Sequence, residues 1–175
     1  MGFDFPNLPY LIDGNVKISE SSAIPRYISQ KIKRPELFGK EGFDQVLHAE
    51  LLGVLGDIRD ANVKIITGDD AEKLFKENSE RVYAGKIKQL EKFLGDKEFL
   101  LGYFTYADLE LDSHLYLLEK ITEKLKKPSL LEHAPKLKAH IHRFFDSPKI
   151  KEFREKNPAS KFPFLPPAFN KLGLE

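Results

Sequence analysis

The order of apolar and polar positions changes once along the chain, from a period of two near the start to the period of a helix further on. Residues 10–12 and 16–18 are β-prone runs that flank Asp13, Gly14 and Asn15. An Asp-Gly pair between two such runs favours a tight turn. The sequence therefore predicts an antiparallel hairpin close to the N-terminus.

A helix should follow this hairpin directly. The hydroxyls of Ser19, Ser21 and Ser22 suit the N-cap of a helix. Pro25 is compatible with a first helical turn, where no backbone N–H is required. The helix should end before Pro35.

From about Glu41 onwards, apolar residues recur every three or four positions, which indicates long amphipathic helices. Gly53 and Gly56 weaken the first of these helices, at a cost of roughly 1 kcal/mol each relative to alanine. Close packing would explain both glycines, and room for a ligand is the alternative. The two main apolar stripes are Val46, Leu47, Leu51, Val54, Leu55 and Ile58, and then Tyr83, Ile87, Leu90 and Leu94.

Residues 104–109 predict the start of a further helix. Thr105 and Asp108 have the spacing of a capping box, in which each side chain bonds the backbone N–H of the other residue. Phe104 and Leu109 have the spacing of the hydrophobic contact that accompanies such a cap. The apolar positions that follow are Leu111, Leu115, Leu118 and Ile121, then Leu137, Ile141, Phe144 and Phe145, and finally Ile150 and Phe153.

These elements predict an α+β fold that is mostly helical. Two strands and one helix occupy residues 1–34, and an all-helical domain occupies residues 41–175. A hairpin with one helix is too little to cover both faces of a sheet. We therefore expect the N-terminal piece to be an incomplete domain.

The composition narrows the possible chemistry. The chain has no cysteine, which excludes disulfides, thiolate nucleophiles and cysteine-based metal sites. Its 28 basic and 27 acidic residues leave a formal charge of +1, so nothing favours nucleic acid or a membrane as partner. The apolar runs are too short to span a bilayer, and the first ten residues do not resemble a signal peptide. A cytoplasmic protein is expected.

The histidines do not suggest a metal site or a catalytic base. His140 and His142 are two residues apart, so they point in different directions on a helix. His48, His114 and His133 have no acidic or histidine partner in a ligand pattern. All five are predicted to be surface or packing residues.

The paired carboxylates are also predicted to be structural. Asp69 and Asp70, like Glu110 and Asp112, are interpreted as helix-start and surface charges. The phosphate-binding glycine motifs are absent from the sequence. No metal and no nucleotide is therefore expected.

A candidate binding site remains in Asn7, Leu8 and Pro9, together with Glu20 and Ser21. A cis peptide at Pro9, just before a strand, would let the backbone pair with an extended peptide ligand. Serine at a helix N-terminus, near free N–H groups and the positive end of the dipole, suits a carboxylate. The residues would hold a small acidic peptide, and ordinary turn and cap chemistry is the alternative.

The stretch DFPNLPYLIDGNVKISESSAIPRYI, residues 4–28, strongly resembles the second half of the thioredoxin-like domain of cytosolic glutathione transferases, and FPNLPYLIDG is closest to the mu class. The likeness continues through the helical domain, including the capping box at Thr105 and Asp108 and the ending at residues 164–167. It covers essentially the whole chain. The resemblance implies conjugation of glutathione, as substrate, to hydrophobic electrophiles.

The resemblance assigns roles to the candidate binding residues. Leu8 and cis-Pro9 would present backbone groups to the cysteinyl part of glutathione, and Asn7 would contact the peptide from the side. Ser21 would bind the γ-glutamyl carboxylate, and Glu20 would lie near the amino group. The mu class commonly has glutamine in place of Glu20, whereas other classes have Glu-Ser as here.

Two further residues are implied to act in a dimer, formed with a second copy or with a relative. Glu50 is the best match for an acid that reaches the glutathione amino group of the partner subunit. Phe5 falls where the mu class has an aromatic residue that inserts between two helices of the partner. A local contact of Phe5 with Phe3 or Phe43 is the alternative.

The resemblance also implies that the family's first strand, helix and second strand have no counterpart in these residues, including the tyrosine that stabilises the glutathione thiolate. Without that group the sulfur pKa would rise and catalysis would be impaired. Tyr10, Tyr103 and Tyr106 are interpreted as packing residues. No catalytic residue is assigned, and Gly68 falls near the family's electrophile-pocket aromatic. An exposed sheet edge should favour association with a partner.

Two other functions compete with an independent transferase. One is a non-catalytic module that dimerises with full-length relatives or binds apolar ligands between its helices. The other is a helical interaction domain in which the N-terminal motif no longer binds glutathione.

Overall fold

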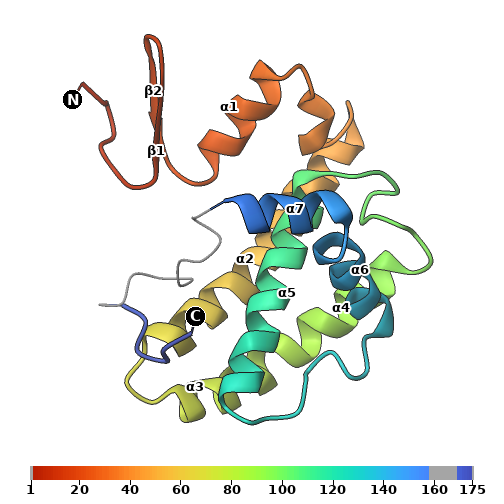
Figure 1. Ribbon diagram of the computed structural model, residues 1–175. Coiled ribbons are helices and arrows are strands. Elements are labelled where there is room, and N and C mark those ends of the chain that lie inside the picture. Colours follow the sequence, from red (N-terminus) through yellow and green to blue (C-terminus); the bar gives the residue numbers. More distant parts are fainter. Residues whose placement is uncertain (1, 158–168, 175) are drawn as a thin grey trace.

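The computed structural model describes residues 2–157 and 169–174 (Figure 1). The ending at residues 164–167, which contributed to the resemblance, lies outside this part of the chain. The described elements are β1 (Tyr10–Asp13), β2 (Val16–Ser19), α1 (Ala23–Lys31), the 3-10 turn η1 (Pro35–Phe38), α2 (Phe43–Thr67), α3 (Ala71–Asn78), the π-helical turn η2 (Ser79–Tyr83), α4 (Ala84–Leu94), α5 (Tyr106–Lys124), α6 (Pro135–Phe145) and α7 (Pro148–Lys156).

The predicted hairpin is confirmed. Strands β1 and β2 pair antiparallel, with Tyr10 opposite Ser19. Gly14 in the turn has a φ of 60°, which glycine adopts at little cost. The end of β1 is tied to α1, because Asp13 accepts a 2.7 Å hydrogen bond from the Tyr27 hydroxyl and pairs with Lys31. Hairpin and first helix therefore form one unit.

Helix α1 begins by a different mechanism from the one predicted. Ser22 occupies the N-cap position, but its side chain makes no capping hydrogen bond, so the prediction of a hydroxyl cap is wrong. The first turn is instead closed by the carbonyl of Glu20, which accepts from the N–H groups of Ala23 and Ile24, both at 3.1 Å. The hydroxyls of Ser21 and Ser22 remain at the exposed start of the helix.

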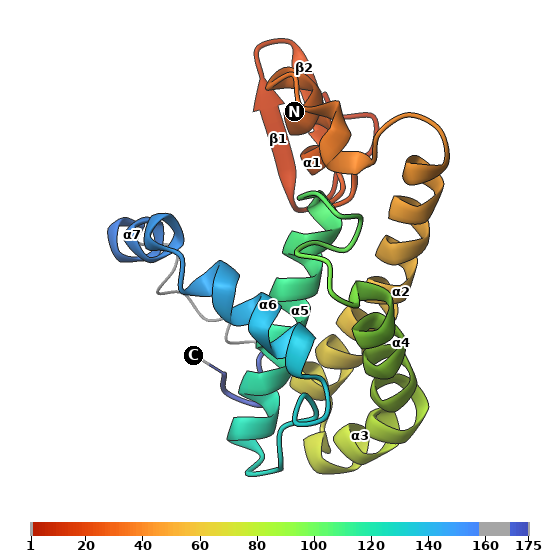
Figure 2. The same cartoon turned by 90° about the vertical axis from the view of Figure 1, so that its right-hand side faces the viewer.

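The helical domain is built around α5, which packs against α2 on one side and α6 on the other (Figure 2). The second predicted stripe is buried throughout, and in the first stripe Leu51, Leu55 and Ile58 are buried. The outer part of the first stripe is not, since Val46 is 58% exposed. The core also includes residues from α3 and α6, such as Phe75 and Leu137.

The helical glycines are not explained by packing within the chain. A Cβ atom built on Gly53 would meet nothing within 4 Å among the described residues. One built on Gly56 would meet only the Arg59 side chain, at 3.9 Å. The prediction of close packing is therefore wrong within the described chain, and this side of α2 is open.

The N-terminal piece rests on the helical domain through the ring of Phe38. This ring stacks on Tyr106 of α5 and meets His48 of α2 edge-on, each with centroids 5.1 Å apart. The guanidinium of Arg26 in α1 lies 4.5 Å from the centre of the same ring. Cation–π and aromatic contacts thus join three helices at one point.

His48 is the unusual member of this contact. Its side chain is fully buried, and neither ring nitrogen has a hydrogen-bond partner in the described part of the chain. Burial lowers the pKa of His48 and the nearby charge of Arg26 lowers it further, while Asp108 opposes both. The neutral imidazole is therefore the form that fits this packing.

We expect this histidine to make the fold sensitive to acid. The ordinary pKa of the group is 6.5 and the folded value is lower, so the unfolded chain binds the proton first. The free energy of unfolding should therefore fall as the pH drops below the ordinary value of 6.5. Denaturant unfolding of the wild type and of His48→Phe, from about pH 8 to about pH 5, checks this.

The His48→Phe variant should lose part of the acid sensitivity, and His133→Asn, at an exposed position, should keep it. Equal pH dependence in all three proteins would show that His48 does not titrate on unfolding.

The open side of α2 generates a second prediction. Gly53→Ala should raise the free energy of unfolding by about 0.5–1 kcal/mol, because alanine costs less backbone entropy in a helix. The midpoint of thermal unfolding should rise by roughly 1–4 °C. Gly68→Ala is the contrasting variant, since its Cβ would lie 2.7 Å from the Lys64 carbonyl oxygen and should destabilise the protein. Destabilisation by Gly53→Ala would mean that another chain covers this face.

Candidate glutathione site

The candidate binding loop is held against the end of β2. The peptide bond between Leu8 and Pro9 is cis. The Asn7 side chain accepts a 2.8 Å hydrogen bond from the Leu8 N–H and donates a 2.9 Å bond to the Glu20 carboxylate. The Ser19 hydroxyl donates to the Phe5 carbonyl, closing the loop from the other side. Two distant sequence segments are thereby fixed in one position.

Glu20 and Ser21 lie at the junction of β2 and α1, and both are exposed. Glu20 has a φ of 79°, in the left-handed region that non-glycine residues seldom adopt. This conformation turns the chain from the strand into the helix. The structure therefore brings Asn7, Leu8, Pro9, Glu20 and Ser21 into one exposed surface.

The structure does not bring Glu50 to this surface, and it leaves the side chain of Phe5 exposed. Glu50 is exposed on α2, and no hydrogen bond among the described residues joins it to the loop. The side chain of Phe5 is 79% exposed. The nearby ring contact involves Phe3 and Tyr10, with centroids 5.4 Å apart.

Comparison with known proteins identifies the family. A sequence model described as the N-terminal domain of glutathione S-transferase matches residues 2–30, and one described as its C-terminal domain matches residues 56–157. The chain is similar to glutathione S-transferase Mu 1 of Bos taurus, with 35% identity over an alignment of 181 positions. The alignment covers 99% of this chain and 74% of that protein. The chain belongs to the glutathione S-transferase family.

Other transferases give the same result. Glutathione S-transferase Mu 2 of Homo sapiens is 33% identical over 99% of this chain and 74% of its own length. The crystal structure of the glutathione S-transferase Blo t 8 superposes with a TM-score of 0.76 over 97% of this chain and 78% of that one, and at 23% identity this shows the fold alone. The structure of NaGST-2 gives a TM-score of 0.67 at 29% identity, over 89% and 76%. The resemblance to the mu class and the predicted fold class are confirmed, while the boundaries at residues 34 and 41 stay predictions.

Two tyrosines of this transferase chain, Tyr103 and Tyr106, are engaged elsewhere. The Tyr103 hydroxyl donates to Asp44 at 2.8 Å and accepts from the Lys40 N–H at 2.9 Å. The Tyr106 hydroxyl donates to Glu110, and burial followed by this bond raises its pKa. Neither group is free to act on a bound sulfur.

Gly68, near the expected position of an electrophile-pocket aromatic, ends α2. A Cβ atom there would collide with the Leu74 side chain and lie 2.7 Å from the Lys64 carbonyl oxygen. This position therefore has no room for a side chain of any kind.

The start of α5 contains a buried carboxylate with several partners. Asp108 accepts 2.8 Å hydrogen bonds from the N–H groups of Leu100 and Thr105 and one of 2.9 Å from the Thr105 hydroxyl. The Nε2 atom of His140 lies 3.3 Å from the same carboxylate. Burial alone would raise the pKa of Asp108, but the close contact with His140 and the hydrogen bonds from Leu100 and Thr105 outweigh burial and lower the pKa. The capping box of the transferase chain is thus extended to α6.

His140 is also paired with Asp112, whose Oδ1 atom lies 2.7 Å from the imidazole Nδ1. Burial lowers the pKa of His140, but the two carboxylates together raise it to about 9. Asp112 is fully buried, so its interpretation as a surface charge is wrong. Sequence analysis missed this pair because its members are 28 residues apart.

A signal for this pair was present in the helix patterns. Asp112 directly follows Leu111 and lies three residues before Leu115, so it falls on the buried face of α5. His140 lies between Leu137 and Ile141 on the buried face of α6. A polar residue inside an apolar stripe on each of two helices indicates a buried pair.

A second correction concerns His114. Its Nε2 atom lies 2.7 Å from the Glu110 carboxylate one turn earlier, so it does have an acidic partner. Glu110 precedes His114 by four residues, so the two side chains lie on the same face of α5. Asp70, in contrast, caps α3 by accepting from the Lys73 N–H at 3.0 Å, as predicted for a helix-start charge.

No metal site is found among the described residues. The closest group, Asp108, Asp112 and His140, does not converge on one point, because the two ring nitrogens face different carboxylates. The expectation that no metal is required stays a prediction. In the same part of the chain, every helix is too short or too polar to cross a membrane.

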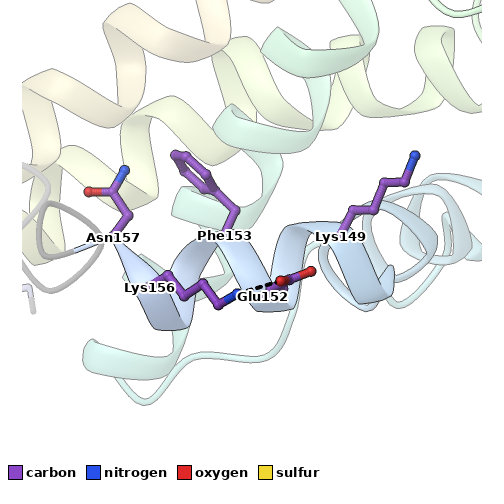
Figure 3. A pocket seen from close by; sticks show the side chains of 5 residues that line it. All are labelled: Lys149, Glu152, Phe153, Lys156 and Asn157. Atoms are coloured by element: carbon purple, nitrogen blue, oxygen red, sulfur yellow. Dashed lines mark hydrogen bonds and ion pairs between the residues drawn. The ribbon is translucent and has the colours of Figure 1, made fainter.

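A shallow hollow lies beside α7 (Figure 3). Its lining residues lie along α7 and directly after it: Lys149, Glu152, Phe153, Lys156 and Asn157. Glu152 and Lys156 form a 2.6 Å ion pair at its edge. Because a single helix lines it, this hollow has no facing wall among the described residues and resembles no enclosed ligand site.

Proposed function

We propose that this chain binds glutathione at the surface formed by residues 7–9 and 20–21. The observation that carries the proposal is the bond from Asn7 to Glu20, which fixes the cis-Pro9 loop beside the N-terminus of α1. The backbone of Leu8 would pair with the cysteinyl residue of an extended peptide. The exposed Ser21 hydroxyl and the start of α1 would receive the γ-glutamyl carboxylate.

We further propose that glutathione bound at this surface takes part in conjugation of its thiolate to hydrophobic electrophiles. The chemistry requires a group that lowers the pKa of the sulfur. Tyr103 and Tyr106 are occupied by Asp44 and Glu110, which argues against either of them as that group. We expect the 175-residue chain alone to bind glutathione and to conjugate it weakly. A non-catalytic binding module is the second candidate, and a cytoplasmic location stays a prediction.

The glutathione site is tested with two neighbouring serines. Ser21→Ala should weaken glutathione binding by about tenfold or more, because a hydrogen bond to a charged carboxylate contributes about 1.5–3 kcal/mol. Ser22→Ala is the matched control, since Ser22 is also exposed and makes no capping bond. Isothermal titration with glutathione checks both.

If Ser21→Ala and Ser22→Ala bind glutathione equally well, Ser21 does not bind the γ-glutamyl carboxylate.

Conjugation is measured separately with a nitro-substituted aryl halide. Turnover no faster than in buffer with glutathione would leave the binding module as the function of this chain.

We also propose that two copies associate through Phe5. A cavity of about 170 Å³ lies between α2 and α4, lined by Leu47, Leu51, Val54, Leu90 and Phe93 together with Glu50 and Gln89. It is apolar and of a size that a phenyl ring can enter. Insertion of Phe5 from each copy into the other would bury this exposed ring and place Glu50 next to the contact.

Phe5→Ser should weaken self-association by roughly 30-fold or more, because loss of a central aromatic anchor costs at least about 2 kcal/mol. Phe153→Ser is the control, since Phe153 is 59% exposed on α7, far along the chain from the proposed contact. Sedimentation velocity over a concentration series checks this. An unchanged dissociation constant for Phe5→Ser would remove Phe5 from the interface.

A further inference from the structure

A second cavity lies in the helical domain, between the loop before α5, α5 itself, α6 and the start of α7. Its volume is about 300 Å³. Phe99 and Phe104 of the loop, Phe144 of α6 and Ile150 of α7 make its walls largely aromatic and apolar. Ligand sites commonly combine such walls with a few polar groups.

Two buried ionisable side chains also line this cavity, Asp112 and His140. The Oδ1 atom of Asp112 is 2.7 Å from the His140 ring. Its Oδ2 atom is buried and has no hydrogen-bond partner among the described residues. A carboxylate oxygen in apolar surroundings is a strong acceptor, and leaving it unpaired is unfavourable. The wall of the cavity therefore contains an acceptor whose hydrogen-bonding capacity is unused, next to the likewise unpartnered Nε2 atom of His140.

The surrounding charges restrict the ligand further. Asp108 and Asp112 together face one imidazole, His140, so the buried group does not favour an anion. Arg143 and Lys149 at the edge of the cavity disfavour a cation, and Glu98 offsets only one of them. A neutral molecule meets neither penalty.

We propose that this cavity binds a small neutral aromatic molecule with one hydrogen-bond donor, such as a phenol. The hydroxyl would donate to Asp112 Oδ2, and the ring would pack among Phe99, Phe104 and Phe144. All lining residues belong to the helical domain, so the site is separate from the glutathione loop and does not depend on the proposed function.

The test compares naphthol with methylnaphthalene, which has the same rings and no donor. Both are titrated into the full chain in the presence of saturating S-hexylglutathione, which keeps the glutathione site and its surroundings occupied. The sequence contains no tryptophan, so naphthol fluorescence can be followed without that background. Naphthol should bind about tenfold or more tightly than methylnaphthalene, since the hydroxyl bonds a charged acceptor.

Two variants locate the binding. Asp112→Asn keeps the shape of the side chain and should reduce the preference for naphthol to about that of the apolar probe. Ser147→Phe fills the cavity from α7 and should abolish binding of both probes. Ser147 makes no side-chain cap bond, so this substitution removes no interaction that begins α7. Ser113→Phe, at an exposed position of α5, is its control and should bind like the wild type.

Thermal unfolding and far-ultraviolet circular dichroism of each variant verify that it is folded. If Asp112→Asn unfolds, the pair Ser147→Phe and Ser113→Phe still decides whether the cavity is the site. Equal affinity of the wild type for both probes would show that the carboxylate is not an acceptor. Binding retained in Ser147→Phe, or no binding of naphthol to the wild type, would overturn the proposal.

Discussion

The carboxylate of Asp108 holds together the start of α5, the loop before it and α6. Its acceptors are filled by backbone N–H groups of Leu100 and Thr105, by the Thr105 hydroxyl and by the contact with His140. A buried charge is tolerable only when it is satisfied in this way, so removing one partner affects the others. Because α5 packs against both α2 and α6, the helical domain depends on this residue.

The same residue indirectly positions the candidate glutathione loop. Tyr106 follows the cap residue Thr105 and supplies the ring on which Phe38 stacks. The Phe38 ring also contacts the guanidinium of Arg26 in α1. Helix α1 begins just after Glu20 and Ser21, which follow the hairpin. The candidate site is thus built on a hairpin and one helix that are oriented by a single aromatic contact. That contact includes the ring of His48, whose nitrogens have no polar partner among the described residues. The packing of α1 against α2 and α5 therefore requires this imidazole to be neutral.

Local chemistry made most of the fold predictable. The Asp-Gly turn, the apolar stripes and the capping box act within a few residues, and each predicted its element correctly. Proline and cap chemistry grouped the site residues as a candidate peptide site, but only the family resemblance gave each of them a role. The bond from Asn7 to Glu20, which spans 13 residues, could not be derived from spacing. The pairing of Asp112 with His140 could not be derived from spacing, because it depends on how α5 and α6 pack. Gly53 was misinterpreted for the same reason: propensity shows its cost, but not which face of the helix is open.

Asp108 and Asp112 lie about one helix turn apart, but only one of them has an oxygen without a hydrogen-bond partner among the described residues. The two carboxylates lie on the same helix and share His140, yet their environments differ. Asp108 has its acceptors filled, and hydrogen bonding lowers its pKa despite burial. Asp112 has one partner, and burial raises its pKa. A group whose bonds are all used can only hold the fold, whereas Asp112 keeps one oxygen available beside an apolar cavity. The shared imidazole couples the two, because a hydrogen bond from a ligand to Asp112 would change how strongly Asp112 holds the ring that also contacts Asp108.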